Sequence, residues 1–193
     1  MRLAIRSEGL SVEDYLAGEE ASDVKHEYFG GAVYAMAGAT KEHNLIAGNI
    51  YASFHRTLRG GPCRPFFGDV KVRLKIMEDD VFYYPDVVVG CDPRDTHRLY
   101  LCFPKVIVEV LSENTERLDR QEKRWNFQTI ETLEEYILVA QNRMEVTVFR
   151  RATRWQAQVH TQPEQKVEFK SLKLKIPVAT IYAGIEVGAR KSK

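Results

Sequence analysis

Two apolar segments, each interrupted by a single carboxylate, constrain the fold of this 193-residue chain more than any other feature. The segment FYYPDVVVG (82–90) contains Asp86, and the segment FPKVIVEVLS (103–112) contains Glu109. Val and Ile favour strands, whereas burying an unpaired charge costs several kcal/mol. The two strands must therefore lie where another group compensates their carboxylates.

Alternation along neighbouring strands would bring these two carboxylates together. Asp86 shares a strand face with Val88, and Glu109 shares one with Ile107. Two close carboxylates repel each other, so one pKa should rise unless a cation neutralises them. Mg²⁺ suits this role because it takes oxygen ligands, often one or two carboxylates plus waters and substrate phosphates. The alternative is that both residues are exposed at strand ends or pair with Arg or Lys.

The rest of the pattern predicts an α+β or mixed α/β chain whose core runs helix, three strands, helix, strand. The third core strand carries Glu109, the second carries Asp86, and the first is expected over 69–76. The stretch RGGPCRP (59–65) is expected only to break the preceding helix. The other expected elements are a helix from Ser11, a hairpin turning at Gly30–Gly31, helices over 40–58 and 115–130, strands over 134–140, 144–152 and 155–161, and a final strand and short helix over 172–185.

Composition favours one globular domain over residues 1–193, with a disordered tail over 187–193. The net charge of +1 means that a nucleic-acid partner would have to bind local basic groups. Three cysteines without CxxC spacing indicate free thiols in a reducing cytosol. Neither a signal peptide nor a membrane helix is indicated, so a cytoplasmic location is expected.

Several of these segments together resemble a known nuclease superfamily. YYPDVVV, FPKVIVEVLS and DRQEKRW resemble the PD-(D/E)XK nucleases. The ordered set EYFGGAVYAMAGATKEHN, PDVVV, VIVEVLSENTERLDRQEK and EEYILV more closely resembles the restriction endonuclease family of the Uma type, over residues 11–185. The resemblance implies a restriction endonuclease-like core with an added N-terminal hairpin and C-terminal strands. It also implies a metal-dependent nuclease.

The same resemblance implies that Asp86 and Glu109 bind Mg²⁺ or Mn²⁺, with the carbonyl of Val110 as a further ligand. Such an ion activates water and stabilises the leaving oxygen during phosphodiester cleavage. Nucleic acid, with DNA expected, is the implied partner. Double-stranded cleavage would need two active sites, so the resemblance implies a homodimer.

The sequence departs from the superfamily pattern at the catalytic lysine, because Leu111 stands two residues after Glu109. Lys123 on the following helix is the candidate replacement, since only the position of the ammonium near the phosphate matters. Leu118 and Trp125 are expected to face inward on this helix, which aims Lys123 away from Trp125. The active-site cleft could still lie on that side, near Asp119 and Arg120. The alternative for Lys123 is a solvated pair with Asp119, four residues earlier.

Four further residues have two interpretations each. Glu27 completes the site in the superfamily resemblance, but a surface strand residue fits equally well. His43 lies on the same side as the apolar stripe of its helix, which favours a supporting histidine over a metal ligand. Asp119 and Arg120 are candidates for supporting the site or contacting a phosphate, although a salt-bridged helix face also fits.

The function predicted from the sequence is therefore that of a metal-dependent nuclease, with Asp86, Glu109, Lys123 and Glu27 as its catalytic residues. One alternative is a catalytically inactive protein that keeps the nuclease fold and acts as a nucleic-acid-binding or regulatory module. A second alternative is a structural or interaction protein, which separated carboxylates would favour.

Overall fold

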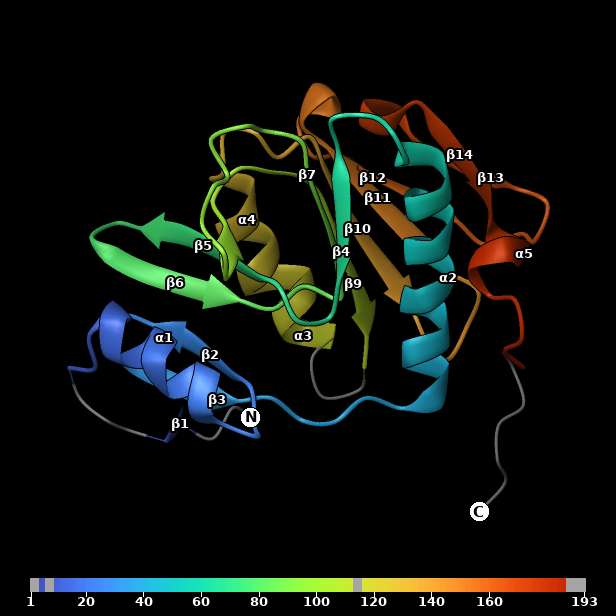
Figure 1. Ribbon diagram of the computed structural model, residues 1–193. Helices are drawn as coiled ribbons and strands as arrows, with labels where there is room; N and C mark the ends of the chain where they lie inside the picture. The colour runs from blue at the N-terminus through green and yellow to red at the C-terminus, as the bar shows by residue number, and fades with distance from the viewer. Residues whose placement is uncertain (1–3, 6–8, 113–115, 187–193) are drawn as a thin grey trace, which may run out of the picture.

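The computed structural model describes residues 4–5, 9–112 and 116–186. It contains two six-stranded sheets and a two-stranded sheet, with helices packed against them (Figure 1). The first sheet has the order β1 (Ala4–Ile5), β3 (Ala32–Ala35), β2 (His26–Phe29), β6 (Asp79–Tyr83), β5 (Lys71–Ile76) and β8 (Tyr100–Leu101). The second has the order β12 (Ala157–His160), β11 (Val146–Arg150), β10 (Glu135–Ala140), β9 (Pro104–Leu111), β7 (Val87–Gly90) and β4 (Arg64–Phe67). The small sheet pairs β13 (Lys166–Phe169) with β14 (Leu174–Pro177).

Apart from two short 3₁₀ turns, the helical elements lie close to where the sequence predicts them. They are α1 (Val12–Ala21), α2 (Lys41–Leu58), α3 (Glu116–Leu118), the π-helix η1 (Asp119–Lys123), α4 (Arg124–Gln128), α5 (Val178–Ile181) and the short 3₁₀ turns η2 (Arg151–Thr153) and η3 (Lys170–Leu172). The predicted helix over 115–130 is thus one helical segment containing a π turn. The tail predicted over 187–193 lies outside the described residues.

Local sequence explains the best predicted elements. The hydroxyl of Ser11 caps α1 by accepting a hydrogen bond from the Asp14 amide at 3.0 Å. The β2–β3 hairpin turns at Gly30 and Gly31, whose φ angles of 52° and 92° are positive, as a tight two-residue turn requires. In α2, Ile50 lies at the centre of an apolar stripe and is fully buried.

The second sheet is covered on both faces. Helix α2 packs on one face against Val87 and Val108, while Phe127 of α4 packs on the other face with Val88 and Ile107. Strands β5 and β6 of the first sheet close the far side of α4 (Figure 1). Alternation on β9 therefore directs Glu109 toward the face that the η1–α4 helix covers, whereas Asp86 lies immediately before β7 and contacts His43 of α2.

The core contains the predicted order of helix, three strands, helix and strand, but its strands differ from the prediction. The segment 82–90 forms two strands, since β6 and β7 belong to different sheets. The chain leaves the first sheet at Pro85, which lacks the amide hydrogen that a central strand needs. The strand expected over 69–76 lies in the first sheet, and β4, from the segment expected to be only a break, pairs with β7 instead.

The buried face of the η1–α4 helix also differs from the prediction. Trp125 is 62% exposed, and the inward residues are Asp119, Lys123 and Phe127, spaced four apart. The prediction assumed that the large apolar side chain points inward. The face beneath the helix carries Glu109, however, so a cation is buried there instead of the indole.

Substitutions on the exposed and buried faces of this helix should differ in their effect on stability. Trp125→Ala is expected to change the free energy of unfolding by less than about 0.5 kcal/mol, because its side chain is mostly exposed. Phe127→Ala should lower it by about 3–5 kcal/mol, because it leaves a cavity between two sheets. Urea unfolding of the two variants measures both values. A larger loss for Trp125→Ala would contradict this packing.

The prediction that all cysteines are free is wrong. Cys63 and Cys91 form a disulfide, with their Cα atoms 4.1 Å apart, while Cys102 is a free thiol. The β4–β7 register pairs Arg64 with Gly90, so the residues just beyond this pair stand opposite each other. This register joins segments that are distant in sequence, and no local pattern indicated it.

Among the described residues, no helix is both long and apolar enough to cross a membrane.

Candidate active site

The antiparallel register of β7 and β9 brings Asp86 and Glu109 together. Val87 pairs with Val108, so one further step places Asp86 opposite Glu109. The Asp86 amide lies 3.4 Å from Oε2 of Glu109 and donates to it. The Val110 amide donates to Oδ2 of Asp86 at 2.7 Å. The Asp86 carboxylate thus contacts the backbone of β9, and the Glu109 carboxylate contacts the backbone just before β7.

Lys123 lies at the centre of a buried group of acidic residues. Its Nζ is 2.9 Å from Oε1 of Glu27, 3.3 Å from Oε1 of Glu109 and 3.3 Å from Oδ1 of Asp119. We call these four residues the Lys123 cluster. Lys123 does pair with Asp119, but the pair is buried, because only 5% of Lys123 is exposed. The cluster joins three elements: β2, β9 and η1.

Negative charge exceeds positive charge in this region. Burial raises the pKa of Glu109 well above its ordinary value, and the charges of Asp119, Asp86 and Glu27 raise it further, against the lowering effect of Lys123. Burial lowers the pKa of Lys123, but its three carboxylate neighbours outweigh burial and hold that pKa well above the ordinary value. Lys123 is therefore a permanent cation at neutral pH.

A π-helix presents both Asp119 and Lys123 to the cluster. The element η1 spans Asp119–Lys123, and such wide turns occur often at functional sites. The hydroxyl of Tyr136, which is fully buried on β10, donates to the backbone carbonyl of Asp119 at 3.0 Å. This bond ties the irregular turn to the sheet directly beneath it.

Removing that hydroxyl should loosen the π turn. Tyr136→Phe is expected to lower the free energy of unfolding by about 1–3 kcal/mol, because a buried carbonyl loses its side-chain donor. Tyr51→Phe, on a partly exposed side of α2, is the matched control and should change it by less than about 0.5 kcal/mol. Chemical denaturation gives both values. Equal losses in the two variants would show that the Tyr136 hydroxyl does not hold the turn.

His43, in the first turn of α2, contacts the other carboxylate of the site. Its Nε2 lies 3.3 Å from Oδ2 of Asp86. Burial lowers the pKa of His43, but the hydrogen bond and charge of Asp86 and the backbone of Val110 raise it, and the balance lies above the ordinary value. His43 is thus placed to hold the Asp86 carboxylate in position.

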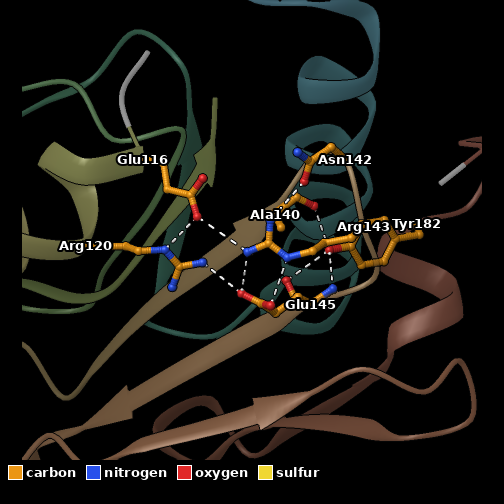
Figure 2. Close-up of polar contacts among 7 residues, drawn as sticks. All are labelled: Glu116, Arg120, Ala140, Asn142, Arg143, Glu145 and Tyr182. Atoms are coloured by element: carbon orange, nitrogen blue, oxygen red, sulfur yellow. Dashed lines mark hydrogen bonds and ion pairs between the residues drawn. The ribbon is translucent and has the colours of Figure 1, made fainter. Parts of the chain in front are cut away.

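Arg120 lies outside the Lys123 cluster, in an ion-pair network shown in Figure 2. Its Nε is 2.9 Å from Glu116, and its guanidinium also reaches Glu145 at 2.8 Å. Arg143 contacts the same two carboxylates. The Tyr182 hydroxyl accepts a hydrogen bond from the amide of Glu145. This network attaches the helix that carries Lys123 to the β10–β11 turn.

Two aromatic residues of the site were missed from the sequence. Tyr136 supports η1, and the ring of Tyr83 lies 5.4 Å from Nζ of Lys123. A signal existed for Tyr136, because a tyrosine within the buried segment EEYILVA needs a hydrogen-bond partner for its hydroxyl. Tyr83 gave no comparable signal, since it lies at the end of β6.

Comparison with known proteins decides the family. Residues 12–179 match the family Uma2, described as "Putative restriction endonuclease". The chain belongs to the Uma2 family. Two curated relatives come from Synechocystis sp. and are named "Uncharacterized protein slr1290" and "Uncharacterized protein sll1609". The first is 35% identical over 91% of this chain and 93% of its own length. The second is 31% identical over 68% of this chain and 75% of its own length.

A solved structure confirms the fold prediction for this Uma2 protein. It is the crystal structure of a "putative nuclease belonging to DUF820" from Anabaena variabilis. The TM-score is 0.70, and the match covers 83% of this chain and 91% of that chain at 15% sequence identity. The mixed α and β architecture is therefore that of a nuclease-fold protein.

Proposed function

We propose that this Uma2 protein is a metal-dependent nuclease that hydrolyses phosphodiester bonds in nucleic acid, with DNA as its substrate. One observation carries the proposal: the buried ammonium of Lys123 contacts Glu27, Glu109 and Asp119 while Glu109 lies beside Asp86. An ammonium and paired carboxylates at one place are the groups that phosphodiester hydrolysis needs for charge stabilisation.

The residues of the site fit a divalent cation. In the described parts of the chain, no three His, Cys, Asp or Glu side chains are arranged as a metal centre. Mg²⁺ does not require such a set, since it often binds one or two carboxylates and fills its remaining positions with water and phosphate. Asp86 and Glu109 supply hard oxygen donors, and the Asp86 side chain is 22% exposed and so reachable from solvent. The excess of negative charge around Glu109 favours a cation there.

In this proposal Asp86, Glu109 and the carbonyl of Val110 hold Mg²⁺ or Mn²⁺. The ion supplies Lewis-acid stabilisation of phosphoryl oxygens and activation of water. His43 keeps Asp86 in position through the 3.3 Å contact. Because the pKa of Lys123 is raised, its ammonium stabilises negative charge that develops on the phosphate and does not act as a base. Cleavage of both DNA strands would use two such sites, so we propose a homodimer.

A cleavage assay tests this function. Purified protein is incubated with supercoiled plasmid, single-stranded DNA or RNA, with Mg²⁺, with Mn²⁺ or with chelator. We expect DNA cleavage that needs the metal and disappears in Asp86→Ala. Asp23→Ala, an exposed carboxylate after α1, is the control and should cleave normally. Absence of cleavage on all three substrates, or full cleavage by Asp86→Ala, would contradict the proposal.

A further inference from the structure

A cavity of about 350 Å³ opens next to the Lys123 cluster. Phe29, Tyr34, Glu122 and Asn126 line it, and we call it the side cavity. The two aromatic residues come from the β2–β3 hairpin, and the two polar residues come from the η1–α4 helix. None of the four belongs to the proposed catalytic set.

Each wall of the side cavity is attached to the cluster. Phe29 follows Glu27 by two positions on β2, so both side chains lie on the same face of that strand. Tyr34 is the direct partner of Glu27 across the hairpin. Glu122 precedes Lys123 in the π-helix. A ligand in the cavity would thus lie beside the ammonium.

Tyr83 does not line the side cavity but connects two of its lining residues to the cluster. Its buried ring lies 5.4 Å from Nζ of Lys123. Its hydroxyl donates to Oε1 of Glu122 at 3.2 Å and accepts from Nδ2 of Asn126 at 2.7 Å. The two polar side chains of the cavity are therefore held in place before any ligand binds.

The chemistry of the lining selects the ligand. The carboxylate of Glu122 repels a phosphate and accepts hydrogen bonds from N–H groups, which excludes the nucleic-acid backbone as the occupant. Phe29 and Tyr34 offer aromatic surfaces on which a base can stack. We infer that the side cavity binds one unpaired nucleobase adjacent to the cleaved phosphate, and that it prefers guanine, whose Watson–Crick edge carries two neighbouring N–H donors.

This inference rests on the proposed nuclease function and narrows its substrate. A base in an intact duplex has its Watson–Crick edge occupied and its faces stacked. A protein that reads that edge therefore acts on single-stranded or locally opened nucleic acid. The substrate class is accordingly DNA with an unpaired guanine next to the cleavage position.

Binding without metal separates base recognition from catalysis. The probe is a short fluorescein-labelled oligothymidine strand with one central guanine, compared with the same strand carrying an abasic site there. In chelator, fluorescence anisotropy should show about tenfold tighter binding of the guanine strand, a difference of about 1.4 kcal/mol. Glu122→Gln and Tyr34→Leu should each remove this difference. Glu122 is exposed, so its amide variant should fold normally, which melting followed by circular dichroism checks.

Two matched controls lie outside the side cavity. Glu131→Gln changes an exposed carboxylate, and Trp125→Leu changes an exposed aromatic residue, and both should keep the tenfold preference. Equal binding of the guanine and abasic strands by the wild-type protein would overturn the inference, as would an unchanged preference in Glu122→Gln. Cleavage without base preference would contradict the proposed role of the side cavity and leave the proposed nuclease function intact. Base preference without cleavage would support the role of the side cavity and contradict the proposed nuclease function.

Discussion

Replacement of Lys123 by methionine is expected to lower the free energy of unfolding by about 3–5 kcal/mol at neutral pH. Methionine keeps much of the aliphatic volume but removes the ammonium that Glu27, Glu109 and Asp119 share. Three buried carboxylates would then face one another without their common cation. This expectation differs from a purely catalytic role, in which folding would be nearly unaffected.

The loss of stability in Lys123→Met should depend on pH in a defined direction. The folded-state pKa of Glu109 lies above its ordinary value of 4.5. At a pH between 4.5 and the folded-state pKa, the native state therefore keeps a proton that the unfolded state has released. Stability contributed by this group is therefore lost as pH rises through the folded pKa. Without Lys123 that pKa should rise further, so the deficit of Lys123→Met should shrink at mildly acidic pH.

Denaturant unfolding at neutral and mildly acidic pH measures this effect. Lys105→Met is the matched control, because Lys105 pairs with Glu134 in a partly exposed position and should contribute less than about 1 kcal/mol. A Lys123→Met deficit no larger than that of the control would show that the ammonium does not stabilise the cluster. A deficit that grows on acidification would contradict the assigned charges.

Glu109→Gln should reduce the rate of DNA cleavage by about a thousandfold, which corresponds to about 4 kcal/mol of transition-state stabilisation. The amide has the shape of the carboxylate but cannot balance a metal ion. Folding should be preserved, because one of the three carboxylates around Lys123 loses its charge while the ammonium stays paired with Glu27 and Asp119.

Initial cleavage rates at saturating protein, measured with Mg²⁺, test this prediction. Glu134→Gln alters a half-exposed carboxylate near the start of β10 and should cleave at the wild-type rate. A Glu109→Gln rate within a few-fold of the wild type would exclude Glu109 from the reaction.

Strand alternation is a short-range property, and it predicted that Asp86 and Glu109 meet only on the assumption that their two strands are neighbours. The pairing of β7 with β9 satisfies that assumption. Lys123 was identified as a candidate, but the predicted orientation of its helix was wrong. A helical wheel that buries Trp125 directs Lys123 outward. In the structure Trp125 is 62% exposed, so Lys123 faces inward. The helix also includes a π turn, which a regular helical period cannot represent.

Long-range pairing was not readable from the sequence. Strand β4 has only four residues, begins after a Gly- and Pro-rich stretch, and gains its place in the core by pairing with β7. That same register brings Cys63 to Cys91. The core sheet contains β4 where the sequence predicted the segment that forms β5. This difference does not affect the candidate metal ligands, which lie on β9 and immediately before β7.

Titration calorimetry with Mn²⁺ tests the central claim most directly, namely that Asp86 and Glu109 form a cation site beside Lys123. The wild-type protein should bind Mn²⁺ with measurable heat, and Asp86→Ala should lose that heat while Asp23→Ala retains it. A wild-type protein that gives no heat of Mn²⁺ binding, or an Asp86→Ala variant that binds as the wild type does, would contradict the account. Either result would favour a catalytically inactive protein that keeps the nuclease fold.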